Sequence, residues 1–224
     1  MTELAIFDLD NTIIKGQSQK LFLGYIFKKR LITRFFYIKL MLWFVLYKLG
    51  LIDNPKKVME YSFKFLKDKD ANEFKEIIND FFEQELKHYI FEDILKIIKE
   101  HKSKKRKTLI ISNAISFIPQ RVADFLGIDY SIGTELEQKN NKFTGKIKGD
   151  IIYSKKKVVA IDCFVRKNKI SLSLSNSYGY SDHHSDIPFL QIVDNPIVVN
   201  PDNNLGEKAK KEGWPILIFN QTIK

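Results

Sequence analysis

Two aspartates one residue apart, Asp8 and Asp10, follow an apolar run at residues 4–7, and this pattern constrains the fold more than any other part of the chain. The run predicts a short buried strand that brings both carboxylates to its C-terminal end. In open α/β sheets, ligands bind outside the carboxyl ends of the strands. Two carboxylates there suit a hard cation such as Mg²⁺, and one of them can attack an electrophile covalently. A solvated acidic turn after an apolar strand gives the same pattern, so this segment alone leaves both interpretations open.

A second apolar segment, at residues 108–111, ends in the polar pair Ser112 and Asn113. The stretch after it predicts a helix, because Pro119 is tolerated in a first helical turn and Gly127 suits the position after the last turn. The free N–H groups of a helix N-terminus, beside a hydroxyl, form a ready phosphate site. The alternative is an ordinary strand end with a helix cap.

A third element is the lysine triplet Lys155, Lys156 and Lys157, which precedes the apolar residues 158–161. One of these lysines could neutralise a phosphate together with the carboxylate that attacks it. The competing explanation is a solvated helix start in a lysine-rich protein, which makes this element the least specific of the four.

The fourth element holds Asp182 and Asp186, at a predicted strand end and the start of the next helix, and this acidic pair again suits Mg²⁺. His183 and His184 lie between them. Neighbouring histidines point in different directions, and the chain has one cysteine and no H-x-x-x-H or C-x-x-C pattern. We therefore predict that both histidines are loop or helix-surface residues and not zinc ligands.

In this order, the four elements resemble the haloacid dehalogenase (HAD) superfamily of phosphohydrolases. Residues 180–190, 198–202 and 213–217 resemble more specifically its subfamily IB, the phosphoserine-phosphatase-like group. The resemblance covers roughly the first 15 residues and the chain from Thr108 onward. It implies an α/β fold in which a Rossmann-like, doubly wound, mostly parallel sheet carries an inserted helical cap domain.

The resemblance also implies catalytic roles. Asp8 would be the nucleophile that forms an aspartyl-phosphate, and Asp10 would act as general acid and then as general base. Ser112 would hydrogen-bond the transferring phosphoryl group. Lys157, directly before Val158, aligns best with the lysine that offsets the charge, although its neighbours in the triplet leave the register open.

The cofactor implied by the resemblance is Mg²⁺. Its ligands would be the carboxylates of Asp8 and Asp182, the backbone carbonyl of Asp10 and, through water or a more distant contact, Asp186. On the substrate side we predict Asn113 and Gln17. Gln17 stands where phosphoserine phosphatases carry a glutamate that binds the ammonium group of the substrate. Because this negative charge is missing, we do not predict selectivity for phosphoserine.

The implied domains are a catalytic core at residues 1–14 and 102–224 and a helical cap at residues 15–101. From Leu31 to Leu51 the cap sequence is apolar and aromatic, but three basic residues interrupt it. A lysine near the centre of a membrane span, as Lys39 would be, costs about 2.5–3.5 kcal/mol, so a full span is disfavoured. A buried cap helix and an interfacial helix on an anionic membrane both fit the pattern.

Composition favours one intracellular enzyme. The 224 residues are 44% hydrophobic, which suits a single α/β core with one insertion. A lone cysteine, Cys163, and no expected signal peptide predict a cytoplasmic protein, either free or at the inner face of the membrane. The net charge is +10, yet the basic residues 102–107 should lie at the edge of the sheet opposite to the catalytic one, so nucleic acid is not expected as a partner. The sequence leaves the oligomeric state open.

Three functions follow from these observations. The first is an Mg²⁺-dependent cytosolic phosphatase for a small phosphomonoester. The second is a phosphatase that acts at the membrane surface on a phospholipid headgroup, similar to phosphatidylglycerophosphatase. The third is a non-catalytic scaffold that binds membrane or nucleic acid, and the intact set of acidic residues argues against it.

Overall fold

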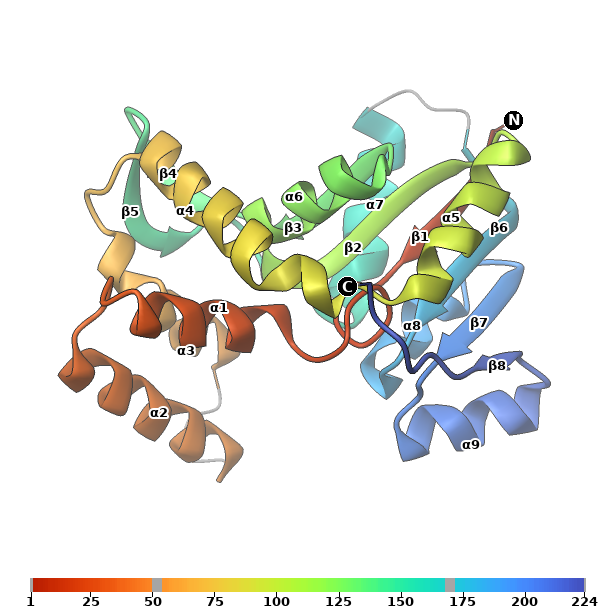
Figure 1. The fold of residues 1–224 in the computed structure, drawn as a ribbon. Helices are drawn as coiled ribbons and strands as arrows, with labels where there is room; N and C mark the ends of the chain where they lie inside the picture. The colour runs from red at the N-terminus through yellow and green to blue at the C-terminus, as the bar shows by residue number, and fades with distance from the viewer. Residues whose placement is uncertain (1, 50–53, 168–171, 224) are drawn as a thin grey trace.

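The computed structural model describes residues 2–49, 54–167 and 172–223. Its centre is a six-stranded sheet with the order β3-β2-β1-β6-β7-β8, and the pairings described in it are parallel (Figure 1). The strands are β1 (Thr2–Phe7), β2 (Lys107–Ile115), β3 (Tyr130–Thr134), β6 (Leu172–Ser181), β7 (Asn195–Val199) and β8 (Ile216–Leu217). The predicted fold class, a doubly wound parallel sheet with a helical insertion, is confirmed.

Both faces of this sheet are covered by helices. Leu4 and Ile6 of β1 pack on one face, with α7 (Lys155–Lys167), α8 (Ile187–Leu190) and α9 (Asn203–Glu212). Ala5 and Phe7 pack on the other, with α5 (Glu92–Ser103) and α6 (Phe117–Leu126). A strand that is buried on both sides needs apolar side chains at every position, which explains the unbroken apolar run before Asp8.

The strand order predicts that a ligand binds beside β1. From β1 the sheet continues through β2 to β3 on one side and through β6 to β7 and β8 on the other. Ligands of doubly wound sheets bind at such a switch point, outside the carboxyl ends of the strands. The backbone N–H of Asp8 donates to the carbonyl of Tyr180 at 2.9 Å, so β1 and β6 end side by side at this edge.

The insertion between β1 and α5 is helical. It consists of α1 (Ser18–Lys28), α2 (Arg34–Lys48), α3 (Pro55–Ser62), the short η1 (Lys64–Leu66), α4 (Ala71–Gln84) and η2 (Leu86–Tyr89). Phe22, Phe74 and Phe81 are buried in its centre, and the rings of Phe74 and Phe81 lie 5.9 and 5.2 Å from that of Phe22. Among the described helices, none combines the length and apolar character that crossing a bilayer demands.

Two segments pack differently from the domain limits predicted from the sequence. The hairpin of β4 (Leu136–Lys139) and β5 (Lys142–Ile147) lies against the helical insertion, where the ring of Phe143 is 5.3 Å from that of Phe74. Helix α5 instead lies on the sheet, and Nε2 of its His101 is 2.8 Å from the hydroxyl oxygen of Tyr180. We therefore propose that the hairpin belongs to the cap and α5 to the core.

Candidate active site

A lysine lies between two carboxylates at the C-terminal edge of the sheet. Asp8 follows β1 directly, and its Oδ1 lies 2.6 Å from Nζ of Lys157. The same ammonium group is 2.7 Å from Oδ2 of Asp186, which also accepts a hydrogen bond of 2.6 Å from the hydroxyl of Ser181. All four side chains are buried. One ammonium thus joins the carboxylate after β1 to the one that follows β6.

The orientation of helix α7 brings Lys157, and not its two neighbours in the lysine triplet, to the site. The helix begins at Lys155, and of the three lysines only the third is buried: Lys157 is 3% exposed, whereas Lys155 and Lys156 are exposed. Nζ of Lys156 pairs with Asp150 at 2.6 Å. Nζ of Lys157 also lies 5.8 Å from the ring centre of Phe189 in α8. The structure therefore separates two solvated lysines from one that reaches the site.

The turn after β1 fixes Asp10 and links it to the fourth motif. Oδ1 of Asp10 accepts the backbone N–H of Ser18 at 2.8 Å, at the start of α1. Asn11 has a positive φ of 54°, which asparagine tolerates better than most residues. Its Nδ2 donates to Oδ2 of Asp182 at 3.0 Å, and its Oδ1 accepts the N–H of Gly16 at 2.9 Å. Asn11 was not among the residues predicted for the site, because nothing in the sequence indicates this contact with Asp182.

Ser112 lies at the same edge, inside a strand that is longer than predicted. β2 continues to Ile115 and does not end at Asn113, and its register with β3 shifts between Ile111 and Ile115. Oγ of Ser112 is buried and accepts the N–H of Ala114 at 3.1 Å, which leaves the hydroxyl hydrogen for another acceptor. Asn113 is half-buried, and its backbone carbonyl accepts from the hydroxyl of Thr134 at 2.8 Å.

Burial shifts the titration of the site. It raises the pKa of Asp8 well above its ordinary value, against the lowering effect of Lys157. Burial likewise raises the pKa of Asp10, although the hydrogen bond from Ser18 opposes it. The pKa of Asp182 rises to about 7, again mainly through burial, with Asn11 acting in the opposite sense.

The carboxylates of the site outnumber its one buried ammonium. Burial lowers the pKa of Lys157, but the negative charges of Asp8 and Asp186 outweigh this and raise it, so the lysine stays protonated. Oδ1 of Asp186 is buried and has no hydrogen-bond partner within the described part of the chain. Excess carboxylate charge and an unpaired carboxylate oxygen fit a hard divalent cation, which prefers oxygen ligands. Asp8, Asp10 and Asp182 could hold such an ion.

A second group of potential metal ligands lies next to Asp182. The rings of His183 and His184 are 4.2 Å apart, so the premise that neighbouring histidines point in different directions is wrong here. Both approach Oδ2 of Asp202, His184 through Nδ1 at 2.7 Å and His183 through Nε2 at 3.5 Å. Asp202 also caps α9 by accepting the N–H of Leu205 at 2.8 Å. These contacts tie the fourth motif to α9.

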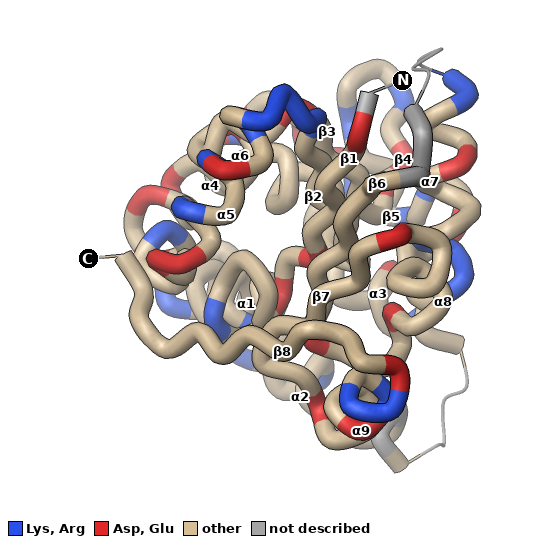
Figure 2. Tube along the Cα trace, turned by 90° about the vertical axis from the view of Figure 1, so that its right-hand side faces the viewer, with Lys and Arg blue, Asp and Glu red and all other residues tan. Residues whose placement is uncertain are grey.

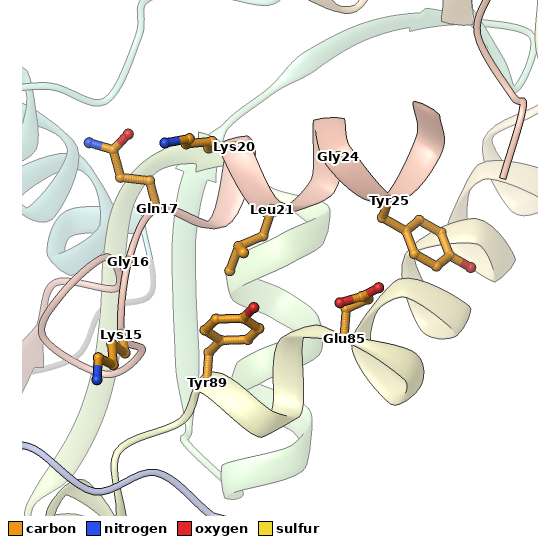
Figure 3. Close-up of a pocket in the computed structure, with 9 residues that line it drawn as sticks. All are labelled: Lys15, Gly16, Gln17, Lys20, Leu21, Gly24, Tyr25, Glu85 and Tyr89. Carbon is orange, nitrogen blue, oxygen red and sulfur yellow. The ribbon is translucent and has the colours of Figure 1, made fainter. Parts of the chain in front are cut away.

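Gln17 is the residue directly before α1, next to Ser18, whose N–H binds Asp10. It is exposed and, with Lys15 and Lys20, lines a hollow of about 510 Å³ between α1 and the end of α4 (Figure 3). Leu21 and Tyr89 face each other across this hollow (Figure 3). Its lining includes none of the four aspartates. The candidate catalytic groups are therefore the carboxylates at the edge of the sheet and not the residues that line this hollow.

Known sequences match most of this chain. The profile of the haloacid dehalogenase-like hydrolases matches residues 5–191. A histidinol-phosphatase of Neisseria meningitidis is 31% identical over 233 residues, covering 98% of this chain and 100% of that protein. A phosphoserine phosphatase of Mycobacterium tuberculosis is 23% identical over 227 residues, covering 98% of this chain and 71% of that protein.

Solved structures share the fold. A protein of unknown function from Bordetella pertussis superposes with a TM-score of 0.87 at 23% identity, covering 97% of this chain and 99% of that one. A substrate-bound phosphoserine phosphatase superposes with a TM-score of 0.64 at 17% identity, covering 97% and 93%. The insertion and the sheet therefore occur together in other proteins as one architecture.

Proposed function

The chain belongs to the haloacid dehalogenase-like hydrolase family and is a phosphoric monoester hydrolase, and we propose that it cleaves its substrate through an aspartyl-phosphate on Asp8. The observation that carries this proposal is the buried ammonium of Lys157, 2.6 Å from Asp8 and 2.7 Å from Asp186. A carboxylate that is to attack an anionic phosphate needs a positive charge beside it. The lysine supplies that charge from within the protein.

In the first step an oxygen of Asp8 forms a bond to phosphorus while the bond from phosphorus to the leaving oxygen breaks. Asp10 gives its proton to that oxygen, and its raised pKa suits a group that must hold a proton before the step. Because Ser18 occupies Oδ1 of Asp10, the other oxygen is the one that faces the substrate. In the second step Asp10 takes a proton from water, and the water oxygen attacks the phosphoryl group and releases Asp8.

Lys157 and Ser112 act on the phosphoryl group. The ammonium offsets the charge that Asp8 and the phosphate bring together, and Asp186 with Ser181 holds it in place. The hydroxyl hydrogen of Ser112 is directed to a phosphoryl oxygen, since its lone pair already accepts from Ala114. We place Asn113, the next residue, on the substrate side. Phosphoryl transfer needs mainly this kind of positioning and charge neutralisation.

We propose Mg²⁺ as the cofactor, held by the carboxylates of Asp8 and Asp182 and by the backbone carbonyl of Asp10, with Asp186 nearby. When bound, the ion screens the carboxylates and the phosphate from each other. The unpaired Oδ1 of Asp186 and the raised pKa values of Asp8 and Asp182 support a divalent cation. The candidate ligands are oxygens only, a set that suits Mg²⁺ as well as Ca²⁺ and Mn²⁺.

For the substrate we propose a small phosphomonoester in the cytoplasm. Gln17 is neutral, so it offers no charge to the ammonium group of phosphoserine. The relative that matches along its whole length is named a histidinol-phosphatase, which makes histidinol phosphate the first compound to test. Phosphate release should be measured for histidinol phosphate, phosphoserine and p-nitrophenyl phosphate, with and without EDTA. Turnover that EDTA leaves unchanged would overturn the metal dependence.

A phospholipid headgroup is the second candidate substrate. The observation that favours it is an exposed apolar face on α2 in the cap. The same phosphate assay with a phospholipid phosphomonoester in mixed micelles separates the two candidates. Preference for the lipid over every soluble compound would reverse their order.

A further inference from the structure

Helix α2 carries a row of exposed apolar side chains. The row alternates spacings of four and three residues, so its four members within α2 share one face of the helix, while Leu31 precedes the helix and Leu49 directly follows it. It contains six of the twelve large hydrophobic side chains that are exposed within the described residues, each between 45% and 76% exposed: Leu31, Phe35, Ile38, Leu42, Val45 and Leu49. A contiguous exposed patch of this kind marks an interaction surface. We call these six residues the α2 row.

The opposite face of α2 already has its partners. Leu40 is fully buried, and the rings of Phe36 and Trp43 stack on Tyr61 of α3 at 5.6 and 4.8 Å. Figure 1 shows α2 as an outer helix of the insertion. The side of α2 that faces the cap core is therefore already packed, and the α2 row is a separate, exposed surface of the cap. Gly50 and Leu51, which complete the predicted apolar segment, lie outside the described residues.

Along the chain, the charges on both sides of the α2 row are of one sign. Residues 11–52 contain eight Lys or Arg residues and no Asp or Glu. Arg34 and Lys39, both exposed, flank the row on its two sides. Another basic segment, the turn between α5 and β2, lies near the N-terminus, where the strands of the sheet begin (Figure 2). An apolar stripe with basic borders and no acidic residue is complementary to an anionic, apolar surface.

The same charges argue against a second copy of the chain as the partner. If two α2 rows formed a coiled-coil seam, Phe35 and Leu42 would occupy one core position and Ile38 and Val45 the other. Arg34 and Lys39 would then sit at the two flanking positions. In a parallel pair Arg34 would face Lys39 of the other helix, and in an antiparallel pair each would face its own kind. Both arrangements place like charges together without a counter-ion.

We infer that the α2 row docks the cap on the surface of an anionic phospholipid bilayer. The helix would lie in the plane of the interface, with the row among the upper acyl chains and Arg34 and Lys39 at the headgroups. Its 15 residues span about 22 Å at the rise of an α-helix, enough for several lipids. The inference concerns the surface of the cap and holds for a soluble or a lipid substrate.

Vesicle flotation tests this inference. The full chain should float with vesicles of phosphatidylcholine and phosphatidylglycerol, and much less with phosphatidylcholine alone. Ile38→Ser should weaken binding about tenfold, since it removes one buried apolar side chain. Ile218→Ser is the matched control, because Ile218 is 63% exposed and Ile38 is 66% exposed, yet Ile218 lies outside the row. Arg34→Gln together with Lys39→Gln should weaken binding to the anionic vesicles by roughly tenfold or more.

Three results would overturn the inference. The first is that Ile38→Ser and the wild type bind vesicles equally well. The second is that the wild type binds neutral and anionic vesicles equally well. The third is that light scattering finds a dimer of the wild type without lipid and a monomer of Ile38→Ser. Hydrolysis of p-nitrophenyl phosphate in solution should be the same in Ile38→Ser and wild type, because the row is remote from the carboxylates of the site. This readout, together with the thermal melt of each variant, separates a failure of docking from a failure of catalysis or folding.

Discussion

Nζ of Lys157 lies 2.6 Å from Oδ1 of Asp8, although 149 residues separate the two in the sequence. The contact depends on two independent features: a parallel strand that ends at Asp8, and a helix whose first turn points its third residue at that strand end. Burying an ion pair costs desolvation, and removing one partner leaves the other uncompensated. The pair is therefore explained better by the charge neutralisation that the proposed phosphoryl transfer requires than by a gain in stability.

Replacement of Lys157 by methionine tests this assignment. Methionine keeps an unbranched stem but removes the charge, so turnover of p-nitrophenyl phosphate should fall by about 10²–10³-fold, as for other groups that stabilise transition-state charge. Lys155→Met is the control, because Lys155 starts the same helix and is exposed. Steady-state kinetics measures both variants. An equal loss in Lys155→Met would show that another lysine of the triplet serves the site.

Asp8→Asn should remove the nucleophile and lower turnover by about 10⁴-fold or more. The fold should persist, because the substitution also removes one negative charge from a crowded carboxylate cluster and leaves the pair of Lys157 and Asp186 in place. Mass spectrometry after acid quenching should find a phospho-adduct in the wild type and none in the variant. Asp162→Asn, on the exposed side of α7, is the control. If Asp8→Asn turned over substrate at the wild-type rate, Asp8 would be excluded as the nucleophile.

Much of the fold was predictable because it depends on local patterns. The apolar run before Asp8 predicted a buried strand, and Gly127 predicted the end of α6, where it adopts a left-handed φ of 62°. The division of cap and core was less accessible. The boundary between the two domains depends on whether the hairpin of β4 and β5 packs on the sheet or on Phe74 of the cap. Packing between aromatic side chains that are far apart in the sequence decides this, and the sequence pattern does not reveal it.

In the candidate site, too, some features could be predicted from the sequence and others could not. Its aspartates follow strand ends, so their placement at one edge could be predicted from the order of the motifs. The roles of Asn11 and Ser181 could not, since each depends on a single contact, to Asp182 and to Asp186 respectively. The burial of Lys157 became clear only from the orientation of α7. The exposed side of α2 was also hidden, because an apolar sequence does not tell which of its faces lacks a partner.

The affinity for the metal ion should depend on Asp182 and not on the neighbouring histidines. Asp182→Asn should raise the Mg²⁺ concentration for half-maximal activity at least about tenfold, equivalent to roughly 1.4 kcal/mol. His183→Ala combined with His184→Ala should leave that concentration within about twofold, since these rings contact Asp202. Activity as a function of Mg²⁺ measures both. A tenfold loss of affinity in the histidine double variant would make the histidines part of the metal site.

The affinity for Mg²⁺ should also depend on pH near neutrality. A carboxyl group binds the ion in its ionised form, and the pKa of Asp182 without the ion is about 7. Below this pH a proton competes with the metal, so the Mg²⁺ requirement should rise roughly tenfold for each unit of pH. Titrations of activity with Mg²⁺ at pH 6 and pH 8 should differ accordingly. Equal requirements at the two values would mean that Asp182 is ionised throughout.

The last prediction concerns stability and involves His101, on the sheet side of α5. The residue is 3% exposed, and its Nε2 lies 2.8 Å from the hydroxyl oxygen of Tyr180. Burial, helped by the nearby Arg106, lowers its pKa from 6.5 to about 4. Between these two values the unfolded chain binds more protons than the folded one, so the free energy of unfolding falls as the pH falls. For this one group the loss from pH 7 to pH 5 should be about 2 kcal/mol.

Urea unfolding at pH 7 and pH 5 measures this loss. His101→Gln keeps a polar atom near the Tyr180 hydroxyl but cannot take up a proton, so its unfolding free energy should change less between the two pH values than that of the wild type. His88→Gln, at an exposed histidine, should behave like the wild type. The other titrating groups, including the aspartates of the site, contribute equally to all three proteins and cancel in the comparison. If His101→Gln loses as much stability at pH 5 as the wild type, the folded state must admit the proton on His101, and the buried contact with Tyr180 must open below neutral pH.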